Sequence, residues 1–516
     1  MIRALARTAR AGLAPVEHLF TRLYGTAGNP FHQLGALSYL LFWIVTVTGV
    51  YLFIFFDTSL GGAYLSVEYL TTTQWYLGGV MRSLHRYGSD AMAVTVTLHL
   101  VREFTLGRYR GGRTFSWVSG VPLLWLLFAS AIGGFWLVWD ELAQYVAIVT
   151  TEWLDWLPNF SEPMAGNFLT NAVLSDRFFS LLVFLHIAIP LFLLVGMFIH
   201  IKRLKEARTK PERSLQWLVI GGLVVLSLIK PVVSMGPADL ANGLAELRLD
   251  WFYLNVYPLI DRWGPGPVWG LLVGFSTLLV LLPWLSPVAR ASKQVAIVNP
   301  PNCNGCSWCY QDCPYEAIQM VPHVDKSGRR MAQVDPDLCT GCGICSGSCP
   351  SATPFRHVDE LVSGIDLPGF SIDHLKGEVE SALDRLQCGA GQGVLVFGCK
   401  YANDVTRLDI PGVEGLTLPC IAQLPPSFMD YLARKDCVSG IFITGCSPDD
   451  CYARLGSRWV EERMHKERMP YLRPSPTTEK ITSWWAGAGE RRALREKVAA
   501  FASAPPTPGG EGDDRG

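Results

Sequence analysis

The sequence predicts a multidomain protein in which an all-α transmembrane helical bundle of about six spans precedes an α+β domain and a small α/β domain. Of the 516 residues, 49% are hydrophobic and 17% are charged, a composition that fits a membrane chain better than a soluble enzyme. The strongly apolar stretches all lie before residue 290, and all 14 cysteines lie between Cys303 and Cys451. The net charge of −1 gives no electrostatic reason to expect a nucleic acid partner.

Six apolar runs are long enough to cross a bilayer, which takes about 20 helical residues. They cover 35–56, 78–101, 117–139, 177–200, 215–235 and 267–286. The first ten residues, MIRALARTAR, are basic and are not followed by the apolar core of a signal peptide. We therefore expect residues 1–30 to form an interfacial segment.

Lys and Arg concentrate in two connecting segments, and such segments face the cytoplasm. One segment, between the second and third runs, holds Arg102, Arg108, Arg110 and Arg113, and the other holds six basic residues from Lys202 to Arg213. The prediction is a multi-pass protein of a prokaryotic inner (plasma) membrane with both termini in the cytoplasm. Thiols stay reduced there, so the dense cysteines indicate metal ligands rather than disulfides.

Four histidines repeat one interval inside two of the spans. His85 and His99 lie 14 residues apart in the second span, and His186 and His200 lie 14 apart in the fourth. On a helix this interval returns to within about 40° of the same face and rises about 21 Å. Two facing helices would therefore offer two imidazole pairs at two depths, and haem iron with two axial histidines is the natural occupant. Residues 1–302 contain no cysteine, which excludes thioether-linked haem.

Glycines repeat the same interval in the neighbouring spans. Gly35 and Gly49 lie in the first span, and Gly120 and Gly134 in the third. Glycine lets a flat ligand approach a helix backbone closely, so these four are candidate haem-binding residues. Arg82 and Arg102 lie one turn from a histidine and are candidates to pair with haem propionates.

These residues, with the segment GGFWLVWDE, resemble the cytochrome b subunit of quinol-oxidising cytochrome bc complexes. The stretch LDWFYLNVYPL is similar to the quinol-site motif of that family, with Asp250 in place of its glutamate. With the topology predicted above, His85 and His186 lie on the outer haem, and His99 and His200 on the inner one. The resemblance implies that these are two haem b groups. It also implies quinone as the substrate and Asp250 as the acceptor of a quinol proton. For Asp250, the alternative is a solvated loop carboxylate.

Two segments, beginning at Cys303 and Cys339, each match C-x2-C-x2-C-x3-C-P. In this pattern three cysteines of one segment hold one [4Fe-4S] cluster while the fourth reaches the other cluster. Cys303, Cys306, Cys309 and Cys349 are expected to hold the first cluster. Cys339, Cys342, Cys345 and Cys313 are expected to hold the second. The pattern resembles a bacterial two-cluster ferredoxin, and a zinc site is the weaker alternative.

Three β-rich runs further along each deliver a cysteine at their carboxyl end, where α/β sheets place ligands. These are Cys399, Cys420 and Cys446, and Cys451 follows in the next loop. Four such thiolates can hold a [2Fe-2S] cluster. The pattern resembles the delta subunit of methyl-viologen-reducing hydrogenases, which implies electron transfer to a flavin subunit. Cys388 and Cys437 are left over and are expected to be structural.

The predicted organisation has seven parts. They are an interfacial segment (1–30), a di-haem bundle (31–210), two further spans with a quinol-site-like loop (211–290), a ferredoxin domain (296–353), a connector (354–389), a hydrogenase delta-subunit-like domain (390–485) and a disordered tail (486–516). A basic helix with Arg454, Arg458, Arg463, His465 and Lys466 is expected to be a solvated face.

The predicted function is a membrane oxidoreductase subunit that links the quinone pool to a cytoplasmic redox partner. The partner is expected to be a flavoprotein, a heterodisulfide-reductase-like subunit or a dehydrogenase subunit, and a homodimer is left open. One alternative is a non-catalytic transmembrane carrier that serves a periplasmic acceptor without a quinone site. A second is an assembly anchor with vestigial clusters.

Overall fold

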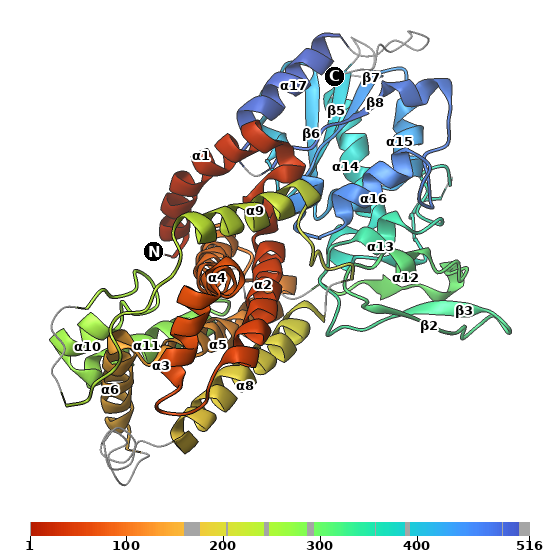
Figure 1. Ribbon diagram of the computed structural model, residues 1–516. Helices are drawn as coiled ribbons and strands as arrows, with labels where there is room; N and C mark the ends of the chain where they lie inside the picture. Colours follow the sequence, from red (N-terminus) through yellow and green to blue (C-terminus); the bar gives the residue numbers. More distant parts are fainter. Residues whose placement is uncertain are drawn as a thin grey trace. The chain divides into compact units, whose positions relative to one another are not determined.

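The computed structural model describes residues 2–158, 176–202, 205–241, 247–285, 294–356, 358–386, 393–487 and 489–504. The chain forms two compact units (Figure 1). Unit 1 comprises Met1–Lys202 and Ala207–Ala289, and unit 2 comprises Arg203–Glu206 and Arg290–Gly516.

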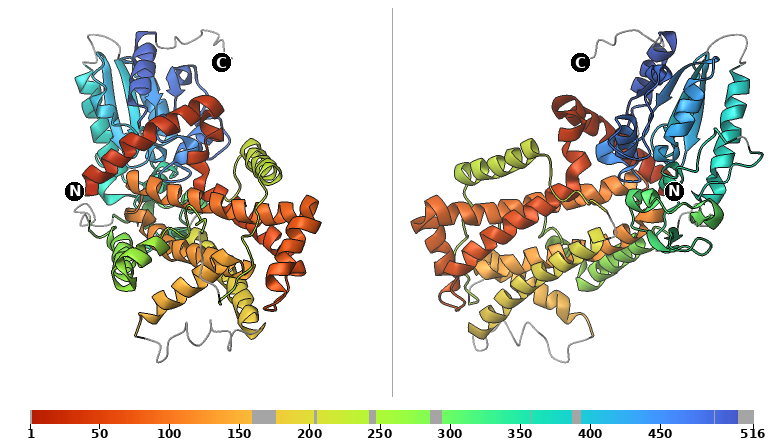
Figure 2. Two further views of the ribbon diagram at one scale, coloured as in Figure 1. Left: turned by 60° about the vertical axis from the view of Figure 1, so that its left-hand side comes forward. Right: turned by 90° about the vertical axis from the view of Figure 1, so that its right-hand side faces the viewer.

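Unit 1 is built of helices, as its long apolar runs predict. In chain order they are α1 (Ile2–Gly28), α2 (Leu34–Phe55), α3 (Ala63–Glu68), α4 (Val80–Thr105), α5 (Thr114–Val138), α6 (Glu141–Asp155), α8 (Asp176–Lys202), α9 (Arg213–Ile229), α10 (Tyr257–Trp263) and α11 (Pro265–Leu281). Helix α2 packs along α4, and α5 packs along α8 (Figure 2). These two helix pairs bring the first span beside the second and the third beside the fourth.

Three of the six predicted spans are long and apolar enough to cross a membrane, among the described residues. They are Pro30–Phe55, Gly111–Val138 and Phe179–Lys202. The second predicted span is α4, whose 26 residues include several charges. The fifth and sixth are α9 and α11, with 17 residues each. The total of six spans therefore stays a prediction.

The arginines of α4 are paired inside unit 1. Arg82 lies 3.4 Å from Glu68, Arg86 lies 2.8 Å from Asp90, and Arg102 lies 2.7 Å from the buried Glu17 of α1. A charge is costly in an apolar interior unless it has a partner. The pairing explains how a helix with this many charges packs within an apolar bundle.

The first part of unit 2 is small and rich in loops. Strands β2 (Ile318–Pro322) and β3 (Arg330–Val334) form an antiparallel hairpin. Strand β1 (Ile297–Val298) pairs with β4 (Ile365–Asp366). The short helices α12 (Trp308–Asp312) and α13 (Ile344–Gly347) complete this part.

The second part of unit 2 is a parallel sheet in the order β6-β5-β7-β8. Its strands are β5 (Gly393–Cys399), β6 (Val413–Leu418), β7 (Val438–Ile443) and β8 (Ile481–Ser483). Leu395 and Phe397 face one core, and Val394 and Val396 face another. This period-2 alternation explains why both faces of the sheet are covered.

Four helices cover the sheet. Helices α14 (Ile372–Arg385), α15 (Pro426–Ala433) and α16 (Gly456–Met464) contribute to one core, and α17 (Arg491–Ser503) contributes to the other. Figure 2 shows α14 and α17 on opposite faces. The three β-rich runs that end in cysteines are confirmed as β5, β6 and β7.

Two boundary predictions are wrong. The expected connector contains α14, whose Leu375, Val379 and Ala382 are buried at helical spacing. The expected tail contains α17, which buries Leu494 and Val498 one turn apart. In both helices charged residues interrupt the apolar ones, so the narrow apolar stripe is hard to recognise in the sequence. Residues 505–516 lie outside the described residues.

The two parts of unit 2 share one core. Ile344 of α13 packs with residues of the sheet, and Cys342 and Cys349 contact the same cluster. At Gly347, an added Cβ would lie 2.1 Å from the carbonyl oxygen of Ala422. The backbones of the two parts therefore approach so closely that a side chain does not fit at this position.

We predict that Gly347→Ala lowers the free energy of unfolding of unit 2 by about 1 to 3 kcal/mol, the usual cost of overpacking. The reason is a clash with Ala422 and Gln423. The atoms nearest the added Cβ are backbone atoms of these two residues, which cannot move aside as a flexible side chain can. Denaturant unfolding of the full-length protein in detergent measures the effect. Gly377→Ala is the control: Gly377 lies in α14 with open space around it, so alanine should stabilise that helix slightly. Equal stability of Gly347→Ala and the unsubstituted protein would contradict the prediction.

Candidate functional site

The structure brings His85 of α4 and His186 of α8 together. Their ring centres lie 6.3 Å apart, with an angle of 63° between the ring planes. A metal-imidazole bond is about 2 Å long, so two imidazoles that bind one iron from opposite sides place their ring centres about 6 Å apart. The observed separation fits a single iron between the two rings.

Hydrogen bonds orient both rings of this pair. The Nδ1–H of His85 donates to the carbonyl oxygen of Val45 at 3.0 Å, and the Nδ1–H of His186 donates to that of Ser130 at 3.0 Å. A carbonyl oxygen only accepts, so Nδ1 carries the proton in each ring. The lone pair of Nε2 is then available for a metal, as is usual for ligating histidines.

His99 and His200 form the second pair, one interval further along the same helices. The two side chains are near neighbours. Nδ1 of His200 lies 3.0 Å from the hydroxyl of Ser119. This hydroxyl orients the ring as the carbonyls do in the first pair.

Each of the four glycines lies against one histidine. An added Cβ would lie 3.0 Å from Cε1 of His85 at Gly49 and 3.0 Å from Cε1 of His186 at Gly134. The corresponding distances are 3.7 Å from His99 at Gly35 and 3.4 Å from His200 at Gly120. The glycines thus make room for the imidazoles, and they divide into the same two depths as the histidines.

Arg82 and Arg102 both have partners within the chain. Arg82 is 7% exposed, contacts Thr71 and donates to Ser234 at 2.7 Å, besides its ion pair with Glu68. Arg102 donates to Glu17 at 2.7 Å. The structure therefore shows protein carboxylates beside both candidate propionate partners.

Asp250 is buried and its carboxylate is occupied. One oxygen forms an ion pair with Arg86, and the other accepts from the backbone N–H groups of Phe252 at 2.9 Å and of Tyr253. The carboxylate is 1% exposed, so the alternative of a solvated loop residue is wrong. Asp250 holds the loop that carries Phe252 and Tyr253.

That loop packs on α4 and α5. The hydroxyl of Tyr253 donates to the carbonyl oxygen of Ser89 at 2.8 Å, and the ring of Phe252 stacks on Phe128 at 5.6 Å. Arg86 also lies over the ring of Phe135, 4.7 Å from its centre. The quinol-site-like loop is thus fixed beside the helices that carry the histidines and the third-span glycines.

The WDE part of GGFWLVWDE forms the corner between α5 and α6. Trp139 adopts a left-handed conformation (φ 51°), and Asp140 caps α6 by accepting from the N–H of Ala143 at 2.9 Å. The second oxygen of Asp140 accepts from the N–H of Met235 at 3.0 Å. The same carboxylate therefore ties the segment after α9 to this corner.

Two cavities in unit 2 are each lined by four cysteines. One is lined by Cys303, Cys306, Cys309 and Cys349. The other is lined by Cys313, Cys339, Cys342 and Cys345. In each set, three cysteines come from one motif and the fourth from the other, as the spacing predicts. In the part of the chain that the structure describes, no three His, Cys, Asp or Glu side chains converge on a single-ion site.

Cys399, Cys420, Cys446 and Cys451 are buried at the carboxyl ends of the strands and in the adjoining loop. The sulfurs of Cys399 and Cys446 lie 3.9 Å apart. The chain runs from β5 to β6 on one side and then to β7 on the other, so these cysteines lie at the point where the strand order reverses. Such points are where open α/β sheets bind ligands.

Burial and neighbouring thiols disfavour free thiolates at this four-cysteine site. Burial, followed by the nearby Cys451 and Cys342, raises the pKa of Cys420 well above its usual range. Buried thiols of this kind are stabilised as thiolates by a bound metal. At Gly456, an added Cβ would lie 2.4 Å from the sulfur of Cys420, so glycine is needed where α16 begins.

Cys437, next to β7, is disulfide-bonded, and Cys388 lies outside the described residues.

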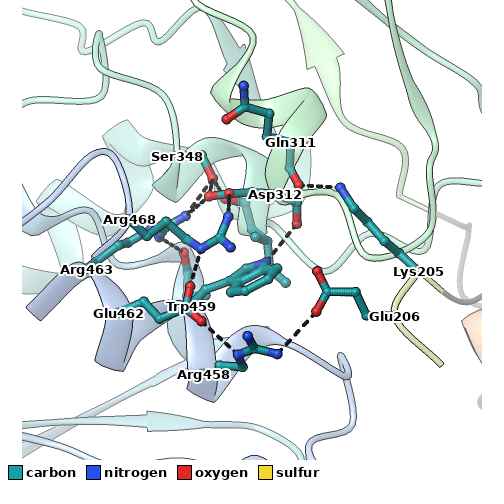
Figure 3. Close-up of polar contacts among 12 residues, drawn as sticks. Lys205, Glu206, Gln311, Asp312, Ser348, Arg458, Trp459, Glu462, Arg463 and Arg468 are labelled. Atoms are coloured by element: carbon teal, nitrogen blue, oxygen red, sulfur yellow. Dashed lines mark hydrogen bonds and ion pairs between the residues drawn. The ribbon is translucent and has the colours of Figure 1, made fainter. Parts of the chain in front are cut away.

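Sequence reasoning missed one buried charge network in unit 2 (Figure 3). Arg463 of α16 was expected on a solvated face, but it is 1% exposed and forms an ion pair with Asp312 at 2.5 Å. Arg468 reaches the other oxygen of Asp312 at 2.7 Å. Asp312 and Arg463 lie about 150 residues apart in the sequence, so no local spacing indicates that they pair. The only sequence signal was the position of Asp312 directly before a candidate ligand cysteine.

Two parts of the chain match known protein families. Residues 23–208 match the cytochrome b/b6/petB family, and residues 302–353 match the 4Fe-4S dicluster domain. Over 178 residues the chain is 30% identical to cytochrome b6 of Heliomicrobium gestii and 31% identical to that of Heliobacterium modesticaldum. Each match covers 34% of this chain and 83% of the relative.

A chain of the solved structure described as Hyperthermophilic respiratory Complex III aligns with a TM-score of 0.39 and 22% identity, over 53% of this chain and 81% of that chain. The family assignment depends on the sequence matches. The chain therefore belongs to the cytochrome b/b6 family and adds a 4Fe-4S dicluster domain to it, which makes it a membrane electron-transfer subunit with haem b and iron-sulfur clusters.

Proposed function

We propose that this protein is a quinone-linked oxidoreductase subunit that passes electrons between the quinone pool and a cytoplasmic redox partner. Two haem b groups, two [4Fe-4S] clusters and one [2Fe-2S] cluster would form the path. The observation that carries the proposal is the pairing of imidazoles at two depths in the same chain as two four-cysteine cavities. When bound, these groups exchange single electrons, while the protein sets their spacing, burial and surrounding charge.

His85 and His186 would ligate one haem, and His99 and His200 the other. The support is the 6.3 Å ring separation and the Nδ1 hydrogen bonds that leave Nε2 free for iron. The distribution of Lys and Arg places the first haem on the outer side and the second on the inner side. The same rule places both termini and the cysteine-rich unit in the cytoplasm.

The four-cysteine site would hold the [2Fe-2S] cluster, as the resemblance to a hydrogenase delta subunit implies. Buried cysteines at three adjacent strand ends and the close approach at Gly456 support this assignment. The partner would then be a flavoprotein of the heterodisulfide-reductase or dehydrogenase type.

Quinol oxidation would take place near Asp250, in the loop on α4 and α5. Asp250 is the candidate acceptor of a quinol proton. The ion pair between Arg86 and Asp250 must open before the carboxylate of Asp250 accepts that proton. The stacked Phe252 and the anchored Tyr253 would hold the loop while this happens.

We predict that His85→Ala and His186→Ala each remove the same one of two haems, because either substitution leaves that iron a single protein ligand. Pyridine haemochrome analysis of the purified chain should fall from two b haems to one. His18→Ala is the control, since His18 is exposed on α1. A loss of both haems or of neither would contradict the assignment.

We predict that the fourth cysteines are exchanged between the two clusters. Cys313→Ser should disrupt the cluster of the Cys339 segment, and Cys349→Ser the cluster of the Cys303 segment. EPR of the reduced variants, with an iron count, distinguishes the two losses when compared with Cys342→Ser and Cys306→Ser. The assignment fails if the Cys313→Ser spectrum matches Cys306→Ser instead of Cys342→Ser.

We predict that Asp250→Asn slows haem reduction by a quinol about 100-fold or more, the usual share of a general base. Stopped-flow absorbance of the haems measures the rate. Asp261→Asn is the control, since Asp261 is an exposed carboxylate of the same region that bonds to Tyr145. An unchanged rate in Asp250→Asn would contradict the role of Asp250 as proton acceptor. No haem reduction by quinol in the unsubstituted protein would favour the alternative, a carrier to a periplasmic acceptor without a quinone site.

A further inference from the structure

Arg463 contacts three segments of unit 2 through one guanidinium group (Figure 3). Its Nη1 donates to the carbonyl oxygen of Ala422 at 2.9 Å. Its Nη2 donates to Asp312 at 2.5 Å and to the hydroxyl of Ser348 at 2.6 Å. Arg463 is 1% exposed, so all these bonds form away from solvent.

Each of these three partners adjoins a cysteine of a different cluster site. Asp312 precedes Cys313, a candidate ligand of the second cubane, and Ser348 precedes Cys349, a candidate ligand of the first. Ala422 follows Cys420 of the four-cysteine site by two residues. A single side chain therefore bonds to a residue within two positions of a cysteine in each of the three cluster sites.

Two guanidinium groups and two carboxylates form one charge network near these sites. Asp312 binds two guanidinium groups, those of Arg463 and Arg468, and its backbone carbonyl accepts from Nε1 of Trp459 at 3.1 Å. Arg468 also lies over the ring of Trp459, 3.3 Å from its centre. Asp312 is shared by both cations, and Glu462 at the rim also pairs with Arg468. Arg463 is therefore the cation of this network that is fully buried.

Burying this ion pair is costly, since both ions lose water. Apolar residues of similar volume could fill the same space at less cost, so stability alone does not explain it. A buried cation acts strongly on nearby charge, because the surroundings screen it weakly. Reduction adds a negative charge to an iron-sulfur cluster, and the charge and hydrogen bonds around it set its potential.

We propose that Arg463 is a positioning residue that holds the second cubane and the four-cysteine cluster as adjacent steps of one electron path and raises the reduction potential of that cubane. This inference rests on the proposed function, because it assumes that the clusters are bound. The close contact of Gly347 with Ala422 and the packing of Cys342 against the four-cysteine core place the two sites side by side.

The sign of the charge effect gives the test. Arg463→Gln removes a buried positive charge and should lower the potential of the second cubane. Asp312→Asn removes the negative charge and should raise it, and the double variant should return close to the unsubstituted value. A purely structural role would not produce opposite shifts that cancel.

An EPR-monitored redox titration of the full-length protein in detergent measures these potentials. Arg458→Gln is the matched control on the same helix: Arg458 is 54% exposed and pairs with Glu206 and Glu462 at the rim, so the potential should not move. Arg463→Lys keeps the charge and should retain most of the potential while losing the bond to Ala422 or Ser348.

The proposal is overturned if Arg463→Gln and Asp312→Asn shift the potential in the same direction, or if neither shifts it. If Arg463→Gln fails to assemble clusters, Asp312→Asn and Arg463→Lys decide: no upward shift in the first, or a clear fall below the unsubstituted potential in the second, overturns it. Iron and sulfide counts on the unsubstituted protein test the proposed function separately, since their failure would remove the clusters themselves.

Discussion

The fixed separation of His85 and His186 is the constraint on which unit 1 depends. Two rings at 6.3 Å require α4 and α8 to face each other at a set distance. The helices beside them then need glycine at the level of each ring, because any side chain would meet an imidazole. The carbonyls of Val45 and Ser130 complete the arrangement by choosing the tautomer of each ring. The separation of the two rings, the glycines beside them and the protonation of Nδ1 are thus all consistent with one iron between His85 and His186.

Charge pairing is the second constraint in this unit. Helix α4 carries His85 and His99 together with three arginines. Arg82 and Arg102 have carboxylate partners from elsewhere in the unit, and Arg86 pairs with Asp90 of α4 itself. Arg86 joins this pattern to the Asp250 loop. The same contacts that make α4 tolerable in an apolar bundle therefore also fix the loop that resembles a quinol site.

Unit 2 uses close backbone approach and one buried guanidinium for a related purpose. Glycines at 347 and 456 allow backbone and sulfur to lie where a Cβ would clash. Arg463 then ties the segments next to three cysteine sites. The cubane part and the sheet part share a core, so the cysteine sites of the two parts belong to one compact unit rather than to separate modules.

The sequence by itself determined the repeating elements and the ligand sets. The helical period places the repeated histidines and glycines on one face of each helix. The short spacings of the C-x2-C-x2-C-x3-C-P segments bring their cysteines together within a loop. In both cases local spacing is enough to identify the ligands. Strands ending at Cys399 and before Cys420 and Cys446 were also readable, because each is a short apolar run. Only the tertiary structure decided which charged residues are buried. Arg463 is buried because it pairs with Asp312, about 150 residues earlier in the chain. Helices α14 and α17 were not predicted, for the same reason. A narrow apolar stripe becomes a core face only when a sheet lies against it.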